Sequence, residues 1–314
     1  MNDSVIEFMT NIGLLPNYAF PETGVKLQAN VYASREKCDK EGNIAEPKAF
    51  ELTRSASQGI KELAPGNHFY TQRFKLNVSG LNTFDWKDSL TEMKYCSKCD
   101  CISLKGEDGF NQTACPKCGD PSWGINKHNI LKFTGARSVM YNNDAALDDS
   151  KEERESENYI IKRHYMFHHM GATTSYAIRG VGFGIEFCNN MELFEVNYGM
   201  KMQSGSKVEV NNDANVSQNG FITCRYCGKS TPVLSGTATE EQHYRFCTHK
   251  DISFADDTKS EVFETLYLYR HMQTEAIKIL LPIQIMDASS AIEMFKSGIQ
   301  LGLKAYYKSS PEHI

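Results

Sequence analysis

Hydrophobic and polar residues alternate along several stretches of the chain, as is typical of strands that bury one face of a sheet. The clearest alternation predicts a strand from about Val25 to Tyr32. A second strand is predicted over Phe69–Val78, and the stretch from Tyr176 to Met202, rich in Gly, Val, Phe and Ile, predicts further strands. Residues 50–66 carry only a weak apolar stripe that ends in the turn at Pro65–Asn67, so no regular element is assigned to them.

Apolar residues at steps of three and four, together with capping signals, predict two helices, one near each end of the chain. Residues 4–13 form the first, because Ser4 and Glu7 match a capping box. The second helix begins near Ser290, with Glu293 three residues later. Its predicted buried stripe consists of Ile292, Phe295, Ile299, Leu303 and Tyr306.

Two polar stretches affect how the chain is divided. The acidic segment 142–158 has almost nothing to bury, so it is interpreted as a linker with a solvated surface. Residues 162–169, KRHYMFHH, combine basic and aromatic side chains. A half-buried helix with exposed charges is the favoured interpretation of this segment, and a nucleic-acid contact is the alternative.

Composition indicates a soluble globular protein, which we expect in the cytoplasm. Hydrophobic residues make up 40% of the chain and charged residues 23%. Neither a long apolar run nor a basic N-terminal leader is present, so we expect no membrane span and no secretion signal. With a net charge of -5, any nucleic-acid contact must be local or shared with a partner.

Most cysteines occur in pairs separated by two residues, which favours metal binding over disulfides. In the first cluster Cys96 and Cys99 form one pair, and Cys115 and Cys118 form the other. This is zinc-ribbon spacing, because each pair curls two thiolates onto one cation and two facing pairs complete a tetrahedron. Cys101 lies close enough to compete as a ligand, but a spare thiol is the favoured interpretation because four ligands are already present.

The second cluster combines the pair Cys224 and Cys227 with His243 and Cys247. A spacing of four would bring His243 and Cys247 to one face of a helical turn. His249 is the rival for the fourth position, and Cys247 is favoured because a thiolate is the softer and stronger zinc ligand. Four protein ligands leave no open position for a catalytic water, so both sites are predicted to be structural zinc sites. The predicted fold class is α+β, with mixed small sheets and helices built around these two sites.

The sequence lacks signals for catalysis. Residues 228–231, GKST, end like a phosphate-binding loop, but Thr223 replaces the required first glycine. Residues 179–184, RGVGFG, do not match the dinucleotide fingerprint and are interpreted as closely packed strands. His164 and His168 are four apart with no third ligand nearby, and neither a catalytic triad nor a carboxylate pair is evident. The chain is therefore not expected to be an enzyme.

Several stretches resemble the region that follows the motor core in large bacterial superfamily-two helicases of the DEAD/DEAH-box type, the relatives of the mitomycin-repair helicase and of phage-defence helicases. In the first half, the matching stretches are IGLLPNYAFPETGVKL and ELTRSASQGIKELAPGNHFY. In the second half, they are FITCRYCGK, HYRFCTH, LYRHMQTEAIKILLPI and GLKAYYKSSPEHI, which are similar to the C-terminal zinc-binding domain of those proteins. The resemblance implies the ligand set Cys224, Cys227, His243 and Cys247 for the second site.

The resemblance also implies a division of the chain. It gives a helicase-associated α/β region at 1–141 with an inserted zinc ribbon at 94–120, the acidic linker at 142–158, and a helicase C-terminal zinc-binding domain at 159–314. Motor domains with nucleotide motifs are missing, so we expect a fragment or one half of a split helicase. Metal at Cys224 is expected to organise the whole of 159–314, whereas the first ribbon should have a more local effect.

The function that the resemblance implies is that of a non-catalytic accessory module of an ATP-dependent DNA helicase or translocase, in phage defence or DNA repair. The implied partners are a helicase motor domain or subunit and, through that complex, DNA, with no membrane. Two structural zinc ions are the expected cofactors. The alternative is a freestanding zinc-dependent nucleic-acid-binding protein, which needs a basic surface that the net charge does not promise.

Overall fold

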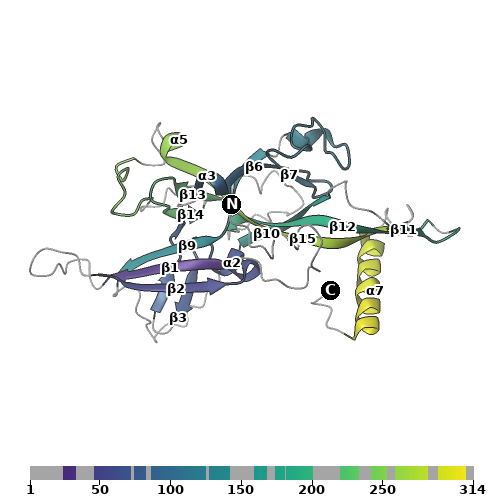
Figure 1. The fold of residues 1–314 in the computed structure, drawn as a ribbon, viewed down its shortest axis with the longest axis horizontal. Coiled ribbons are helices and arrows are strands. Elements are labelled where there is room, and N and C mark those ends of the chain that lie inside the picture. The colour runs from purple at the N-terminus through teal and green to yellow at the C-terminus, as the bar shows by residue number, and fades with distance from the viewer. Residues whose placement is uncertain are drawn as a thin grey trace, which may run out of the picture. The chain divides into compact units, whose positions relative to one another are not determined.

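A computed structural model describes residues 24–32, 46–71, 74–82, 86–124, 127–141, 159–167, 174–180, 182–200, 220–232, 242–252, 259–281 and 289–308 (Figure 1). Strands make up most of the regular structure there, and helices are few. The predicted α+β fold class with small sheets is confirmed. The predicted helix at 4–13 and the predicted acidic linker at 142–158 lie outside the described residues. No helix in the described ranges is long and apolar enough to cross a membrane.

A four-stranded sheet contains the predicted first strand, β1 (Val25–Tyr32). The strand order is β2 (Lys48–Arg54), β1, β9 (Gly135–Tyr141) and β5 (Gly80–Leu81), and β1 runs parallel to β9. Side chains on β1 alternate between buried and exposed, and its buried face consists of Val25, Leu27, Ala29 and Val31. Helix α2 (Ala56–Glu62) lies close to this sheet at Gly59, where a Cβ would come within 2.6 Å of Val25 Cβ.

The segment predicted as one strand over Phe69–Val78 is instead a hairpin. β3 (His68–Thr71) pairs antiparallel with β4 (Phe74–Asn77). The prediction of a single strand is wrong because Thr71 lies opposite Phe74, so the chain reverses between them. Residues 50–66, to which the pattern assigns no element, contain the end of β2 and all of α2.

A nine-stranded sheet combines strands from both halves of the chain. The order along its path is β10 (Tyr159–Phe167), β12 (Gly184–Met200), β15 (Phe263–Leu280), β8 (Lys127–Lys132), β6 (Leu90–Tyr95) and β7 (Ile102–Leu104). Off this path, β11 (Thr174–Ala177) pairs with β12, and β13 (Phe221–Cys224) pairs with β14 (Ser230–Pro232) and with β15. The remaining short helices are α3 (Trp86–Ser89), η1 (Pro121–Gly124) and α5 (Lys259–Val262). The strands predicted within 176–202 are thus confirmed in β11 and β12, but the interpretation of residues 179–184 as closely packed strands is wrong, because Arg179 and Gly180 lie in a turn and β12 begins only at Gly184.

The segment 162–169 lies largely in strand β10, so its interpretation as a half-buried helix is wrong. The buried side chains repeat every two residues, with His164 and Met166 on the same side of the strand. His164 is fully buried, and its Nε2 lies 2.7 Å from the hydroxyl oxygen of Tyr198. Burial lowers the pKa of His164 to about 4. This histidine is therefore a neutral core residue, while His168 lies outside the described residues.

The chain forms two compact units whose bounds differ from the predicted domains. One unit comprises 1–166 and 193–272, and the other comprises 167–192 and 273–314. The division falls within β12 and β15, and the first unit contains strands from both predicted domains. All eight predicted zinc ligands belong to the first unit. The predicted bounds at 141 and 159 stay a prediction.

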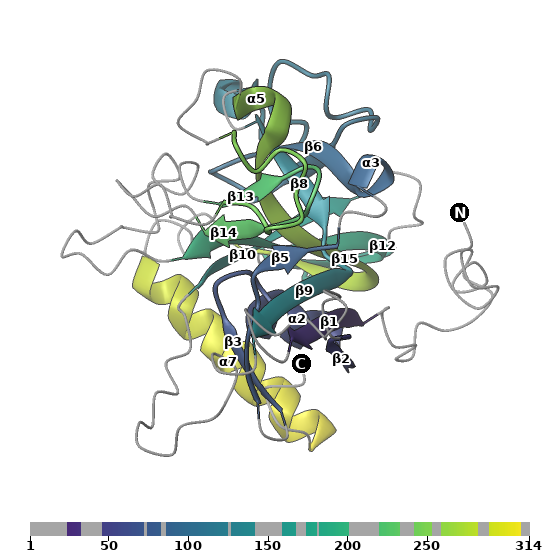
Figure 2. The same ribbon diagram turned by 90° about the vertical axis from the view of Figure 1, so that its left-hand side faces the viewer.

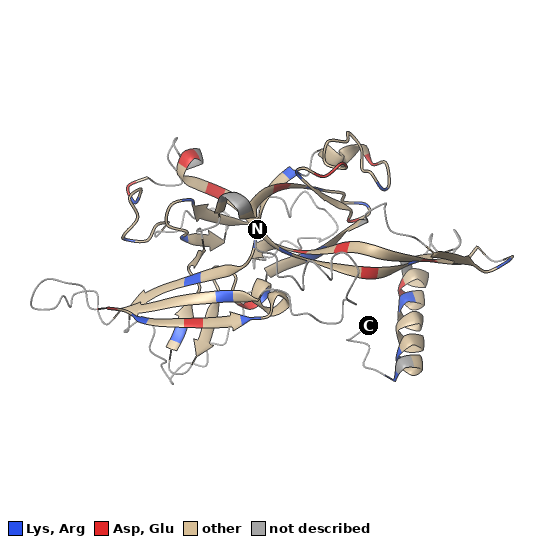
Figure 3. Ribbon diagram, viewed as in Figure 1, with Lys and Arg blue, Asp and Glu red and all other residues tan. Residues whose placement is uncertain are grey.

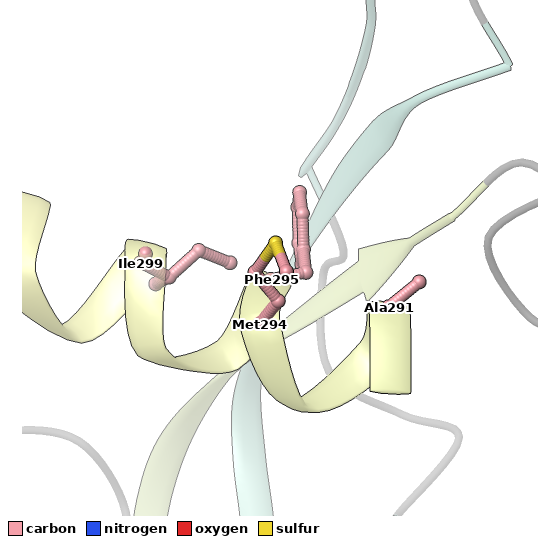
Figure 4. Close-up of a pocket in the computed structure, with 5 residues that line it drawn as sticks. Ala291, Met294, Phe295 and Ile299 are labelled. Carbon is pink, nitrogen blue, oxygen red and sulfur yellow. The ribbon is translucent and has the colours of Figure 1, made fainter. Parts of the chain in front are cut away.

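The second unit carries helix α7 (Ser289–Tyr307), which confirms the predicted C-terminal helix. Phe295 is half-buried, and its ring centroid lies 6.0 Å from that of Phe183. Tyr306 is 80% exposed, so its predicted burial is wrong. Periodicity shows which face of a helix is apolar, and only a packed neighbour buries that face. An open depression on α7 is lined by Ala291, Met294, Phe295, Gly298 and Ile299 (Figure 4).

Candidate metal centres

All three Cys-x-x-Cys segments fold into the same type of turn. The residue after the second cysteine has a positive φ in each, 52° at Asp100, 74° at Gly119 and 76° at Gly228. Its amide donates to the carbonyl oxygen of the first cysteine, at 2.9 Å in all three turns. The amide of that first cysteine donates in turn to the carbonyl oxygen of the residue that follows the positive-φ position. These local bonds hold the two thiols of each pair close together, as a shared cation requires.

The first candidate site brings together the four predicted sulfur atoms. Sγ of Cys96 lies 3.5 Å from Sγ of Cys118, and Sγ of Cys99 lies 3.6 Å from Sγ of Cys115. All four sulfurs lie within 4.8 Å of one another. A tetrahedron with Zn–S bonds of about 2.3 Å has edges of about 3.8 Å between its sulfurs. The quartet therefore fits a tetrahedral metal ion held by four thiolates.

Strands β6 and β7 carry the first cysteine pair at their connection, and the second pair directly precedes η1. Trp123 in η1 is fully buried against cysteines of this cluster, and its Nε1 donates to the carbonyl oxygen of Gly109 at 3.2 Å. Cys101 is buried beside the quartet but is not part of it. Its absence from the quartet agrees with its interpretation as a spare thiol, and burial raises the pKa of this thiol to about 12.

The second candidate site brings together the four side chains predicted for it. Sγ of Cys224 lies 3.9 Å from Sγ of Cys247, and Sγ of Cys227 lies 4.0 Å from Nδ1 of His243. The four ligand atoms lie within 4.8 Å of one another. The cysteine pair sits in the turn between β13 and β14, and the other two ligands come from the turns of residues 242–252. This quartet also fits a tetrahedral ion, with three sulfurs and one nitrogen.

Neighbouring groups select the ligand atoms of the second site. Nε2 of His243 lies 2.8 Å from the carbonyl oxygen of Ile252, so it donates its proton there and leaves Nδ1 for the metal. His249 is not part of the quartet, and its ring stacks on that of Tyr226 at 3.6 Å. Its backbone amide donates to Sγ of Cys247 at 3.4 Å. Geometry thus favours Cys247 over His249, and the helical turn predicted for residues 243–247 is wrong, because they form non-helical turns.

The thiols in each quartet differ in acidity. Burial raises the pKa of Cys96 and Cys99, whereas a backbone hydrogen bond from Asp120 lowers the pKa of Cys118. In the second site, a hydrogen bond from Cys224 lowers the pKa of Cys227 to about 5. Each quartet therefore contains one thiol with a lowered pKa, and a bound cation would hold the thiols with raised pKa values as thiolates.

The first site contacts a strand from the second half of the chain. The hydroxyl of Tyr165 in β10 donates to the carbonyl oxygen of Cys99. The backbone amide of Tyr165 donates to the carbonyl oxygen of Asp100 at 3.1 Å. Lys117, between the cysteines of the other pair, donates to the hydroxyl of Tyr165, and its Nζ lies 4.0 Å from the ring centroid. Both cysteine pairs are thus joined to one side chain of β10.

The second site contacts the first half of the chain through β5 (Figure 2). The amide of Leu81 donates to the carbonyl oxygen of Gly228 at 2.8 Å. The hydroxyl of Tyr244 lies 2.9 Å from that of Ser79, and both groups are buried. A Cβ at Gly80 would come within 2.6 Å of the same Gly228 oxygen, so this close approach requires glycine.

Sequence reasoning missed the residues that hold the sites in place. Tyr165 lies in a segment interpreted as a helix, and Tyr244 lies between two ligands without a motif of its own. No sequence signal marks Gly80 either, since its partner lies in the other half of the chain. Comparisons with protein-family models, with curated proteins and with solved structures find no match to this chain.

Proposed function

We propose that both quartets hold structural zinc and that this chain is a non-catalytic accessory module of an ATP-dependent DNA helicase or translocase, acting in phage defence or DNA repair. The observation that carries the proposal is the closure of both sites, because each offers four protein ligand atoms at tetrahedral spacing. A site closed in this way leaves no position for a water or a substrate, which separates structural zinc from catalytic zinc. The metal ions would then shape a surface for a partner.

The donor atoms favour zinc among the divalent metals. Sulfur and imidazole ligands in tetrahedral arrangement are typical of zinc, and four sulfurs alone also suit iron–sulfur centres. His243 in the second quartet supports zinc, because three cysteines and one histidine form a common structural zinc set. Elemental analysis of the purified chain should find zinc at a ratio near two, one ion for each quartet.

The stretch ELAPGN, which carries part of the resemblance, has a structural role. Asn67, its last residue, donates from Nδ2 to the carbonyl oxygens of Lys61 at 3.1 Å and Glu62 at 3.2 Å, and so satisfies acceptors at the end of α2. The hydroxyl of Tyr159, from the second half of the chain, donates to the carbonyl oxygen of Pro65 at 3.0 Å. These contacts hold the stretch between α2 and β10, so its residues are accounted for by a structural role.

Co-expression and co-purification with a superfamily-two DNA helicase motor test the accessory role. The complex should form and should hydrolyse ATP in the presence of DNA faster than the motor alone. The chain alone should turn over no ATP, because it has no phosphate-binding loop to hold the nucleotide. Cys224→Ser is the control, since loss of one zinc should remove the stimulation and leave the basal rate of the motor unchanged.

Two outcomes would contradict the accessory role. ATP turnover by the chain alone, surviving replacement of the zinc ligands, would show an enzyme of another type. DNA binding by a chain that neither joins nor stimulates the motor would support the second candidate, a freestanding zinc-dependent nucleic-acid-binding protein. The basic residues in the segments that carry the second quartet, Arg225, Lys229, Arg245 and Lys250, favour that candidate over any catalytic role.

A further inference from the structure

The second candidate site exposes two aromatic rings beside its ligands. Tyr226 is 55% exposed and Phe246 is 61% exposed. Tyr226 directly precedes the ligand Cys227, and Phe246 directly precedes the ligand Cys247. Aromatic rings that project into solvent beside a rigid site are available to stack on the bases of a nucleic acid.

Local contacts hold both rings in place. The ring of Tyr226 stacks on that of His249 with centroids 3.6 Å apart and an interplanar angle of 19°. The ring of Phe246 lies 5.2 Å from that of Tyr244 at an angle of 17°. The ligand atoms next to both rings belong to one quartet, within 4.8 Å of each other. A single metal ion would therefore fix both turns from which the rings extend.

Basic residues outnumber acidic ones in the two segments that carry these rings, although the whole chain is acidic. Among residues 220–232 and 242–252, Asp251 is the acidic residue, and the basic residues are Arg225, Lys229, Arg245 and Lys250. Figure 3 shows Lys and Arg positions in the loops beside β13 and β14. Arg225 forms an ion pair with Glu264 and keeps a side chain that is 40% exposed.

The first site shows no such surface and provides an internal comparison. Residues 94–120 contain the basic Lys94, Lys98, Lys105 and Lys117 and the acidic Asp100, Glu107, Asp108 and Asp120, which balance. No large apolar side chain is exposed in this fully described range. The exposed aromatic rings and the excess of basic residues are thus found at the second site alone of the two. They are not a general requirement of cysteine turns that bind zinc.

We infer that the second site binds single-stranded DNA through a surface made of Arg225, Tyr226, Arg245, Phe246 and Lys250, called the knuckle face below. Aromatic rings stack on nucleobases of any sequence, and arginine and lysine attract the phosphates. A duplex keeps its base faces stacked inside, so an unpaired strand fits this surface better. The inference rests on the proposed role beside a DNA helicase, whose product is single-stranded DNA.

Fluorescence anisotropy with a labelled oligothymidine of about 16 nucleotides measures this binding, because small binding modules cover sites of up to that length. The full zinc-loaded chain should bind the strand, and a duplex of equal length should compete poorly. Tyr226→Ala and Phe246→Ala should each weaken binding by roughly 5- to 160-fold, the loss expected for one base–ring stack. Tyr226→Phe keeps the ring and should bind like the unmodified chain.

A charge variant and two matched controls make the test specific. Arg245→Gln should reduce the slope of log affinity against log salt by about 0.7, the value for one phosphate contact on a single strand. Tyr176→Ala removes a ring that is 62% exposed elsewhere, and Lys304→Gln removes an exposed charge on α7. Both controls should bind DNA like the unmodified chain, and an unchanged zinc content in every variant shows that the sites are intact.

Five results separate the inference from the proposed function. Lack of binding by the zinc-loaded chain, or an equal loss in Tyr176→Ala, overturns the inference. Tighter binding of an oligouridine RNA overturns the assignment to DNA. A further outcome is that a variant with both Tyr226→Ala and Phe246→Ala keeps its DNA affinity but no longer binds the helicase motor. In that case the knuckle face contacts protein, so the accessory role is supported and the DNA-binding inference is overturned. If DNA binding needs both rings but the chain joins no helicase motor, the DNA-binding role of the knuckle face is supported and the accessory role is contradicted.

Discussion

Individual residues differ in how clearly the sequence shows their role. The ligand positions could be predicted from spacing, because two residues between thiols suit a turn that wraps one cation. The choice between Cys247 and His249 needed the structure, which places only Cys247 in the quartet. Gly80 could not be predicted as a contact of the second site, because its role depends on a backbone oxygen of Gly228 in the other half of the chain.

Gly80→Ala should lower the free energy of unfolding by roughly 1 to 3 kcal/mol, the usual cost of forcing extra atoms into a packed site. A Cβ there would clash with the carbonyl oxygen of Gly228 at 2.6 Å and with the hydroxyl of Tyr244. Urea unfolding midpoints measure the effect. Gly124→Ala is the matched control, because a Cβ at that position meets nothing within 4 Å. Equal midpoints for the two variants would mean that β5 moves away from the second site without cost.

Among the elements, predictability follows the kind of burial. β1 has one buried face and one exposed face, so alternation along its sequence marks it correctly. The alternation does not reveal β10, because the fully buried His164 is a polar residue at a core position. The pattern predicts one strand where the structure has the hairpin of β3 and β4, because Gln72 and Arg73 between the strands are not residues that mark a turn.

The cysteine turns are short elements whose glycines can be tested. Gly119→Ala should weaken zinc binding at the first site by about 1 to 2 kcal/mol, because its φ of 74° puts a Cβ close to the following carbonyl oxygen. No other atom lies within 4 Å of a Cβ there, so the cost is one of backbone conformation alone. Gly119→Asn should lose less, since asparagine adopts this conformation more readily. Competition with a chelator measures the affinities, and equal values for all three proteins would show that the turn tolerates any residue.

At the scale of the whole molecule, each candidate site contacts the half of the chain that does not contain its ligands. Tyr165 joins the first site to β10, and Gly80 lies against the turn of the second site. The sequence did not predict these contacts, since pairing between distant segments leaves no local pattern. They also explain why compact units in the structure do not end at the predicted linker. A purely local effect of the first ribbon, as expected from its position in the sequence, is hard to reconcile with the contacts of Tyr165.

Loss of either metal should therefore destabilise hydrogen bonds in the half of the chain that does not contain its ligands. Cys96→Ser and Cys224→Ser should each release one zinc ion, whose apparent binding energy of about 10 to 16 kcal/mol is as large as the net stability of a domain, roughly 5 to 15 kcal/mol. Hydrogen exchange should then speed up at the amide of Tyr165 in the first variant and at the amide of Leu81 in the second, because their acceptors lie in the turns that lose the metal. The amide of Leu27, in a strand between two partner strands, should exchange less rapidly than either. If Tyr165 stays as protected in Cys96→Ser as in the unmodified chain, the first site is a local excursion and its contact with β10 does not stabilise the sheet.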